Sequence, residues 1–418
     1  MIKLPLKKSL GKSLLDGNTP IVALDIGTET IKSILFTMND YGVTVNKVSR
    51  IQQQQHAMRS GIITNLDTVL ENCKLSINEL LTNLKPEEFP RYVMMGIAGE
   101  YVQGVSIVVN YEREQHFEKE VTQKEQEKII KEVKSQIAVT GKDDLSLRTG
   151  LKNDDIEILH ITPTGMEIGG MPVNSLVGYK GRNVKLNFYA SFAPRTYTEA
   201  LRKVASSLNF EVLGIVSQPF AVARAHSGGR NTNFSAIFLD VGGGTTDVAI
   251  VKNGNVADTQ MFAFGGRVFT KELARLTDSD FRHAELRKIK YSQKELPKEV
   301  MRQVQKTMYT TATLWMRTLK AALESCEDTG PLPTQIYLCG GGALLPDIKS
   351  ALMEFPWKRY LPIAVVPKIE MFTPDLLGSV TDNSGDLQYI YDITPASLAK
   401  FLYDMEMDRK TKNINWEA

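Results

Sequence analysis

Short apolar runs that end in glycines recur at three distant places along the chain. Residues 237–252 read IFLDVGGGTTDVAIVK, residues 22–32 read VALDIGTETIK, and residues 336–346 read IYLCGGGALLP. Apolar runs of this length, bounded by turn residues, predict buried strands. The first two stretches therefore predict a strand, a turn and a second strand, and the third predicts a strand followed by a helix.

Between these stretches the apolar positions shift from strand-like to helix-like spacing. Helical spacing predicts helices over 67–84, 122–137, 196–208 and 297–324, and Pro219 suits the first turn of another. Further strands are predicted over 43–48, 91–98, 105–109 and 184–193. Residues 141–155, GKDDLSLRTGLKNDD, predict a charged loop. The mixture predicts an α/β protein.

The order of these elements divides the chain into segments, and 418 residues are enough for two lobes. We expect a basic tail over 1–19, a first lobe over 20–90 and 176–235, a second lobe over 236–370 and a C-terminal segment over 371–418. Residues 91–175 are expected to form an inserted α+β unit. That unit carries no nucleophile–base pair and no metal-ligand cluster, so its sequence favours an interaction role.

Composition narrows the class of protein. Hydrophobic residues make up 42% of the chain and charged residues 23%, the balance of a soluble globular protein. No apolar run is long enough to cross a bilayer, and no signal-peptide pattern is present. The three cysteines have unrelated spacings, which favours a reduced, cytoplasmic compartment. A formal net charge of +2 gives no reason to expect nucleic acid as a partner.

The first fifteen residues combine a basic character with a regular apolar spacing. Ile2, Leu6, Leu10 and Leu14 recur at every fourth position, while four lysines and no acid lie between them. On a helix this pattern gives an apolar stripe beside a basic face, which is typical of a helix lying on an anionic membrane. Pro5 and Gly11 oppose a helix, so a solvated tail is the alternative.

The glycine turns are candidates for binding a phosphate. Successive backbone N–H groups in such turns form a concavity that accepts an anion, and a carboxylate at the end of a strand suits Mg²⁺ and its waters. Gly265 and Gly266 precede a predicted helix, where N–H groups and the helix dipole also favour phosphate. The alternative is a set of glycine-rich turns with no ligand.

Three further side chains are candidates for contacts in the same site. Lys32 follows the first turn on the next strand and presents an ammonium, although a surface lysine is the alternative. Gln218 stands immediately before Pro219, where it either faces a cleft or caps the helix. Glu285 and Lys288 share a helix face, which serves either a ligand or a solvated ion pair.

The order of the three glycine turns resembles the actin/Hsp70/sugar-kinase ATPase fold. The phrases MRSGIITNLD, SLVGYKGRNVKLNFYASFAPRT, FGGRVFTKELA and AELRKIKY are similar to the bacterial FtsA cell-division proteins. This resemblance implies an actin-like fold with two lobes around a nucleotide cleft and an FtsA-type inserted subdomain. It also implies binding of ATP with Mg²⁺, self-association into filaments, docking of the C-terminal tail of FtsZ, and attachment to the inner face of the plasma membrane.

The resemblance also assigns roles to individual residues. It implies a first phosphate site at Asp25, Gly27, Thr28 and Lys32, and a second at Asp240, Gly242, Gly243, Gly244 and Thr245. It implies ribose and base contacts at Glu285 and Lys288, and an adenosine loop at Gly340, Gly341 and Gly342. Asp25 and Asp240 would hold the metal, and Gln218, with Asp240, would orient the attacking water. Hydrolysis is expected to be slow at most, because glutamine cannot take the proton.

Two departures from the FtsA pattern keep other functions open. The C-terminal SLAKFLYDMEMDRK and NINWEA lack the linker and basic amphipathic helix of that family, and residues 141–155 are longer and more charged than expected. A PilM-like pilus assembly adaptor, which binds the N-terminal tail of a membrane partner, is therefore the alternative. A metabolic kinase of the same fold would need a catalytic acid, for which Asp247 is the candidate.

Overall fold

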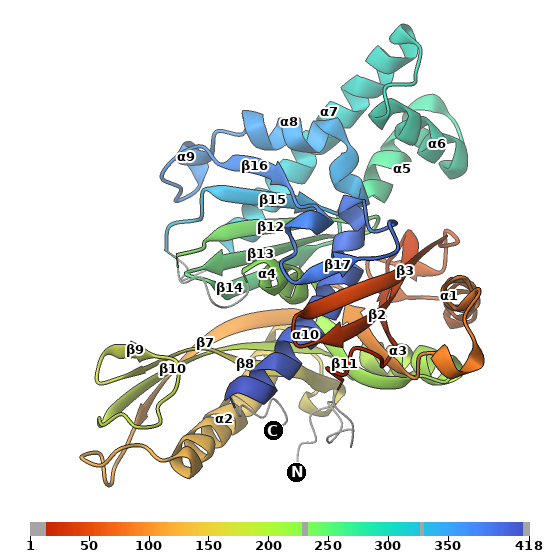
Figure 1. Cartoon of the computed structure of the whole chain (residues 1–418). Helices are drawn as coiled ribbons and strands as arrows, with labels where there is room; N and C mark the ends of the chain where they lie inside the picture. Colours follow the sequence, from red (N-terminus) through yellow and green to blue (C-terminus); the bar gives the residue numbers. More distant parts are fainter. Residues whose placement is uncertain (1–13, 228–232, 327–329, 413–418) are drawn as a thin grey trace.

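Two β-sheets form the frame of the molecule in the computed structural model, which describes residues 14–227, 233–326 and 330–412 (Figure 1). One sheet has six strands in the order β11-β6-β1-β2-β3-β17, and the other has nine in the order β16-β15-β12-β13-β14-β7-β10-β8-β9. The tail predicted to meet a membrane lies outside the described residues except for its last two positions. Of these, Leu14 was predicted to face the membrane but is buried in the core of the protein. The NINWEA stretch lies outside them as well.

The six-stranded sheet belongs to the first lobe and is buried on both faces. On β1, Ala23 packs toward α4 and α10, whereas Val22 and Leu24 pack toward α1 and α3. A strand covered on both faces reads as a continuous apolar run, which explains the sequence of this strand. The strands are β1 (Ile21–Ile26), β2 (Thr30–Asn39), β3 (Gly42–Gln52), β6 (Tyr92–Ile97), β11 (Glu211–Ser217) and β17 (Val380–Asp382). The helices are α1 (Leu66–Leu81), α3 (Arg195–Ser207), α4 (Gln218–Ser227) and α10 (Ile393–Lys412), and β4 (Met58–Arg59) pairs with β5 (Ile62–Ile63) beside them.

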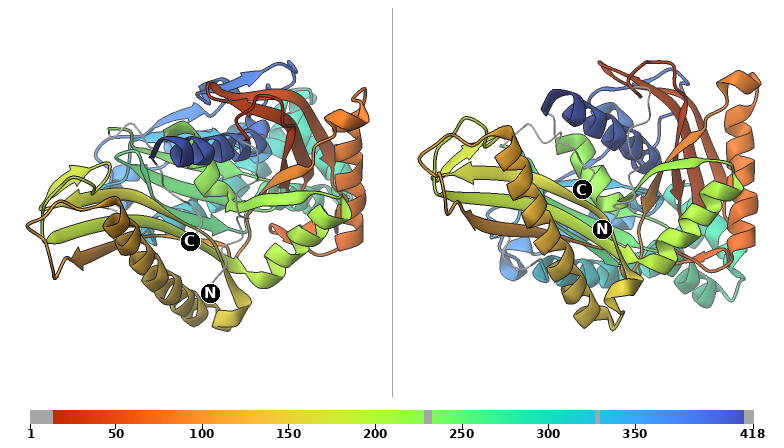
Figure 2. Two further views of the ribbon diagram at one scale, coloured as in Figure 1. Left: turned by 60° about the horizontal axis from the view of Figure 1, so that its bottom comes forward. Right: turned by 90° about the horizontal axis from the view of Figure 1, so that it is seen from below.

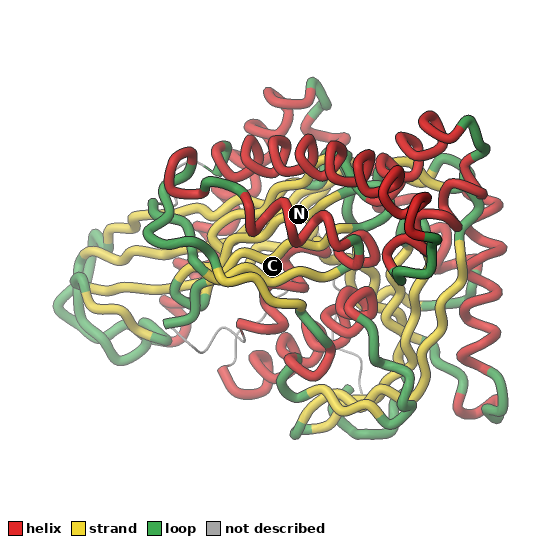
Figure 3. Tube along the Cα trace, turned by 90° about the horizontal axis from the view of Figure 1, so that it is seen from above, coloured by secondary structure: helices red, strands yellow, loops and turns green. Residues whose placement is uncertain are grey.

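The second lobe repeats this arrangement around β12. Phe238 packs toward α4, and Ile237 and Leu239 pack toward α5 and α7. Its strands are β12 (Ala236–Val241), β13 (Thr246–Lys252), β14 (Asn255–Phe262), β15 (Gln335–Cys339) and β16 (Lys368–Met371). Its helices are α5 (Gly266–Thr277), α6 (Phe281–Ser292), α7 (Lys298–Glu324), α8 (Pro346–Glu354) and α9 (Trp357–Tyr360). Seen from above, helices lie across the strands of this sheet (Figure 3).

The inserted unit continues the sheet of the second lobe. Strand β7 (Gln103–Glu112) pairs with β14 through Asp258 and Val105, and then with β10 (Asn183–Pro194). The sheet ends with β8 (Ile156–Ile168) and β9 (Met171–Val173). Helix α2 (Gln123–Thr149) covers one face of these strands (Figure 2).

The structure confirms the three strand–glycine modules and corrects three details near the inserted unit. We expected residues 91–98 to belong to that unit, but β6 lies in the six-stranded sheet between β1 and β11. We expected residues 184–193 to belong to the first lobe, but β10 pairs with β7 and β8 of the inserted unit. Residues 141–149 are the last turns of α2 and not a loop. Gly141 packs against the ring of Phe192, so this glycine permits a close contact and does not break the helix. The domain boundaries themselves stay a prediction.

The C-terminal helix α10 is part of the core, where it packs against α4 and β1. Its acids, which interrupt the apolar pattern, are held in ion pairs: Lys400 with Asp404 at 2.5 Å, and Arg224 with Asp408 at 3.1 Å. Among the described helices, none combines the length and apolar character needed to span a bilayer.

Candidate functional site

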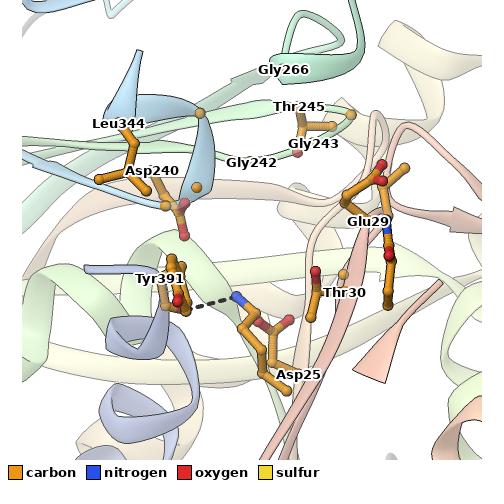
Figure 4. Close-up of a pocket in the computed structure, with 18 of the residues that line it drawn as sticks. Asp25, Glu29, Thr30, Asp240, Gly242, Gly243, Thr245, Gly266, Leu344 and Tyr391 are labelled. Atoms are coloured by element: carbon orange, nitrogen blue, oxygen red, sulfur yellow. Dashed lines mark hydrogen bonds and ion pairs between the residues drawn. The ribbon is translucent and has the colours of Figure 1, made fainter. Parts of the chain in front are cut away.

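The three glycine turns meet at one cavity between the two lobes. The cavity has a volume of about 640 Å³ and is lined from both lobes, with Asp25 and Glu29 on one side and Asp240 and Gly243 on the other (Figure 4). Strands β1 and β12 each end at this cavity, so the strand–turn modules carry their polar residues to the same place.

The first turn brings an acid and a lysine into direct contact. Asp25 and Lys32 face each other across the β1–β2 pair, and the Lys32 Nζ lies 2.6 Å from Asp25 Oδ2. The same ammonium donates to the carbonyl oxygen of Tyr391 at 3.0 Å. Burial alone would lower the pKa of Lys32, but Asp25, Asp240 and Asp392 together raise it. Lys32 is therefore a largely enclosed cation of the cleft, with a side chain 13% exposed, and not a surface lysine.

Gln218 joins this pair from the start of α4. Its side-chain Nε2 donates to Asp25 Oδ1 at 2.8 Å, and its exposed fraction is only 9%. Strand β11 runs directly into α4, and Pro219 occupies the first turn of that helix. This connection directs the glutamine toward the cavity, which is one of the two alternatives that the sequence left open.

The second turn supplies two more carboxylates, of which Asp247 is buried and Asp240 is partly buried. Asp240 and Asp247 are directly opposite each other on β12 and β13. Asp240 Oδ2 accepts from Thr394 at 2.8 Å, and burial raises the pKa of Asp240 although Lys32 and Thr394 oppose the rise. Burial, with the charges of Asp240 and Asp25, raises the pKa of Asp247 well above its usual range. Within the described part of the chain, Asp247 Oδ1 has no hydrogen-bond partner.

The balance of charge in this cleft favours a cation. Asp25, Asp240 and Asp247 carry three formal negative charges, and among them Lys32 supplies one positive charge. A hydrated divalent cation would offset the remainder. The described residues contain no group of three His, Cys, Asp or Glu side chains that could hold a metal by themselves. Such a donor set suits Mg²⁺, which keeps several waters and takes its other ligands from phosphates.

The third turn closes over the end of β12. Gly340 adopts φ of 83°, a conformation that L side chains rarely adopt, and a Cβ at this position would overlap the carboxylate of Asp240. Gly341 begins a short 3₁₀ helix that ends at Leu344, and a Cβ on Gly341 would face open space. The turn therefore presents bare backbone and one open face to the cavity.

Helix α6 contributes an ion pair to the far side of the cavity. Lys288 Nζ lies 2.8 Å from Glu285 Oε2, and their side chains are 11% and 14% exposed. Lys288 also donates to the carbonyl oxygen of Gly266 at 3.1 Å, and Thr270 Oγ1 donates to Glu285. The pair is thus buried and tied to the start of α5, which excludes the solvated surface pair that was the alternative.

The structure brings all but one of the predicted site residues to the cavity wall. These are Asp25, Gly27, Thr28, Lys32, Gln218, Asp240, Gly242, Gly243, Gly244, Thr245, Gly266, Glu285, Lys288, Gly340, Gly341 and Gly342. Gly265 does not line the cavity. A Cβ at Gly265 would lie 2.6 Å from the carbonyl oxygen of Gly242, so this glycine lets α5 approach the second turn.

Other lining residues were missed by the sequence reasoning. They include Glu29, Thr30, Arg50, Ile289, Ser292, Gln293, Leu344 and Tyr391, and Asp247 was considered only for a kinase. Arg50 and Tyr391 belong to β3 and to the segment before α10, which the fold brings together. Arg50 donates to both carboxylate oxygens of Asp392, each at 2.7 Å. No motif marks these positions, whereas Glu29 is adjacent to the first turn and could have been included.

Comparisons with known proteins agree with this geometry. Residues 237–374 match the family model "Cell division protein FtsA". The chain is 24% identical to the cell division protein FtsA of Neisseria meningitidis over 65% of this chain and 61% of that protein. It is 23% identical to FtsA of Enterococcus hirae over 89% of this chain and 84% of that protein. A solved structure described as a PilM-PilN type IV pilus biogenesis complex has a TM-score of 0.67 at 14% identity, over 92% of this chain and 99% of that chain.

The chain has the actin-like fold, with two lobes around a central cavity. The likeness to the pilus protein shows this shared fold and nothing finer. Beyond the fold, the chain is similar to the FtsA cell division proteins, through the family match over residues 237–374 and through the relatives at 23–24% identity. The Neisseria match spans less than two thirds of that relative.

Proposed function

We propose that this chain is a nucleotide-binding cytoskeletal adaptor of bacterial cell division. It binds ATP with Mg²⁺ in the cleft between its lobes and self-associates into filaments. In this proposal it also links the C-terminal tail of FtsZ to the membrane, at the cytoplasmic face. The single observation that supports it most is the convergence of three glycine turns and three aspartates, two of them buried, from both lobes on one cavity.

Each wall of the cavity has a part in holding the nucleotide. Backbone N–H groups around Gly27 and around Gly242 to Gly244 suit the phosphates, and the Lys32 ammonium adds a fixed positive charge. The Glu285–Lys288 pair suits the ribose and base, while Gly340 to Gly342 offer bare backbone to adenosine. Asp25 and Asp240 would hold Mg²⁺ through its waters, and the ion would neutralise phosphate charge when bound.

Hydrolysis is proposed to be slow. Gln218 orients a water but has no proton-accepting group at neutral pH. Asp247 is the candidate base, because its Oδ1 is buried without a hydrogen-bond partner in the described chain and its side chain lines the cavity. Burial and the charges of Asp240 and Asp25 raise the pKa of Asp247 and so disfavour its charged form, and a protonated carboxyl cannot accept a second proton.

The replacement of Asp240 by Ala tests the nucleotide-dependent part of the proposal. Asp240 accepts a hydrogen bond from the Thr394 hydroxyl and interacts with the charge of Lys32. Its removal should therefore abolish ATP binding, measured by calorimetry, and should also abolish ATP-dependent sedimentation. Asp278→Asn, an exposed change on the same lobe, serves as the control. Sedimentation that still depends on ATP in Asp240→Ala would contradict the proposal.

Membrane attachment through the basic N-terminal segment is tested by flotation with anionic liposomes. The full chain should float with the liposomes, and a version lacking residues 1–13 should remain at the bottom, since the four lysines are lost together with Ile2, Leu6 and Leu10. Neutral liposomes serve as the control. Equal flotation of both versions would exclude this segment as the anchor.

The PilM-like role remains the second candidate, and it shares the fold with the cell-division role. Pull-down with an FtsZ tail peptide and, in parallel, with the N-terminal tail of a pilus membrane protein separates the two. The curated relatives are cell division proteins, so capture by the FtsZ peptide is the expected result. A metabolic kinase would instead show ATP turnover that a small metabolite stimulates strongly.

A further inference from the structure

Arg267 connects the two phosphate turns across the cleft. It lies in the first turn of α5, next to the second phosphate turn, where the N–H groups of Gly266 and Arg267 donate to the carbonyl oxygens of Gly242 and Gly243 at 2.9 and 2.8 Å. The backbone of Arg267 is therefore fixed to the second lobe.

The side chain of Arg267 reaches the first lobe. Its Nε donates to Glu29 Oε2 at 2.6 Å and its Nη2 donates to the carbonyl oxygen of Thr28 at 2.8 Å. Its Nη1 donates to the carbonyl oxygens of Gln55 and Met58, each at 3.1 Å. All four acceptors belong to the first phosphate turn or to the segment after β3. The guanidinium carries five donors in a planar fork, which a single ammonium cannot reproduce.

The turns are also in direct contact beneath this arginine. A Cβ on Gly243 would lie 2.7 Å from the Cβ of Glu29, and a Cβ on Gly244 would lie 2.8 Å from Thr28 Oγ1. The Arg267 and Glu29 side chains are 12% and 26% exposed, so water screens their ion pair only in part. Glu29 faces the cavity (Figure 4), and without Arg267 it would be an unpaired anion beside the place where phosphates are proposed to bind.

We infer that Arg267 is a positioning residue, which clasps the first phosphate turn against the second and neutralises Glu29; this inference rests on the proposed nucleotide site. The clasp has two consequences. It holds the phosphate end of the cleft closed, so a bound triphosphate leaves slowly. It also removes a repulsive charge, so a triphosphate binds more tightly.

Release of a fluorescent ATP analogue from the full chain, with Mg²⁺ present, tests the clasp. Arg267→Gln should release the analogue about tenfold faster or more, because a charge-assisted pair and three hydrogen bonds are lost together. Arg267→Lys should fall between this variant and the wild type, since it can remake only the Glu29 pair. Arg275→Gln, on the same helix but with an exposed guanidinium paired with Glu272, should leave the release rate unchanged.

A second change separates positioning from a general loss of structure. Adding Glu29→Gln to Arg267→Gln should recover part of the lost affinity for the analogue, because the unpaired carboxylate is removed. A merely destabilised fold would be damaged further by the second substitution. Wild-type release in Arg267→Gln, or no recovery in the double variant, would overturn the inference.

Failure of the nucleotide proposal is distinguishable from failure of the clasp. If the wild type binds no nucleotide at all, the proposed function fails. Hydrogen exchange without ligand then decides the clasp: amides of residues 27–30 should exchange faster in Arg267→Gln than in the wild type and in Arg275→Gln. Equal exchange in all three would overturn it.

Discussion

Asp247 is the residue of the cleft at which binding chemistry most directly opposes stability. It is buried, its Oδ1 finds no partner among the described residues, and two further aspartates lie close enough to disfavour its charge. A charged carboxylate in this environment lowers the free energy of unfolding. Proteins tolerate such a loss of stability where function requires the group. At the residue scale, then, the candidate catalytic group should be a destabilising one.

Replacing Asp247 by Asn should stabilise the protein and slow any ATP hydrolysis. The folded pKa is raised above 3.8, so the wild type loses stability as pH rises from 3.8 through the folded pKa, and the amide removes that loss. The expected gain at neutral pH is about 1 kcal/mol or more, and hydrolysis should fall about 10²-fold or more if Asp247 is the base.

Urea unfolding at a series of pH values, together with ATP turnover, checks this prediction. Stability that still declines with pH in Asp247→Asn, in parallel with the wild type, would show that another group carries the dependence. Asp278→Asn, which removes an exposed carboxylate of the same lobe, should move neither stability nor turnover.

Helix α2 shows how an element can run past a glycine. The predicted loop over 141–155 rested on Gly141 and the charged residues after it, yet the helix continues to Thr149 and ends at Gly150, where φ is 73°. The ring of Phe192 on β10 occupies the space that a Cβ at Gly141 would need. The packing requirement therefore outweighs the low helix propensity of glycine.

Gly141→Ala should consequently destabilise the protein, although alanine favours helices by about 1 kcal/mol over glycine. Overpacking against Phe192 is expected to cost about 1–3 kcal/mol, so the net change should be a loss. Thermal unfolding measures it, and Ser135→Ala on the exposed face of the same helix should raise or preserve the melting temperature. A higher melting temperature in Gly141→Ala would show that the Phe192 ring moves at little cost to make room for the added Cβ.

At the scale of elements, the local sequence was enough to predict those parts of the site whose residues are consecutive in the chain. The strand–Asp–glycine modules could be predicted because their acid, turn and partner strand are consecutive in the chain. Arg50, Tyr391 and Arg267 could not, because they reach the cleft through contacts between residues far apart in sequence. The burial of α10 could not be predicted for a related reason. Its acids Asp404 and Asp408 interrupt the apolar pattern, and the ion pairs that allow them to be buried form only in the folded molecule.

The two lobes are joined on both sides of the cleft, which makes the molecule a single coupled body around the site. One hydrophobic core includes Ile21 of the first sheet, Phe238 of the second and Leu398 of α10. Beside the cavity, Thr394 at the start of α10 donates to Asp240, and Arg267 holds Glu29. A ligand that contacts the glycine turns of both lobes must therefore act on the stability of the whole fold.

ATP with Mg²⁺ should accordingly raise the free energy of unfolding of the whole chain in one cooperative step. At a ligand concentration of about one hundred times Kd, linkage predicts a gain of about 2.7 kcal/mol. Hydrogen exchange should slow at both 27–30 and 242–245, because the phosphates are proposed to lie between these turns. Removing Mg²⁺ with a chelator should reverse most of the gain, since three aspartates and the phosphates would then repel one another with only Lys32 among the acids to offset them. Protection confined to one lobe, or a gain that is indifferent to the chelator, would mean that the ligand does not bridge the cleft.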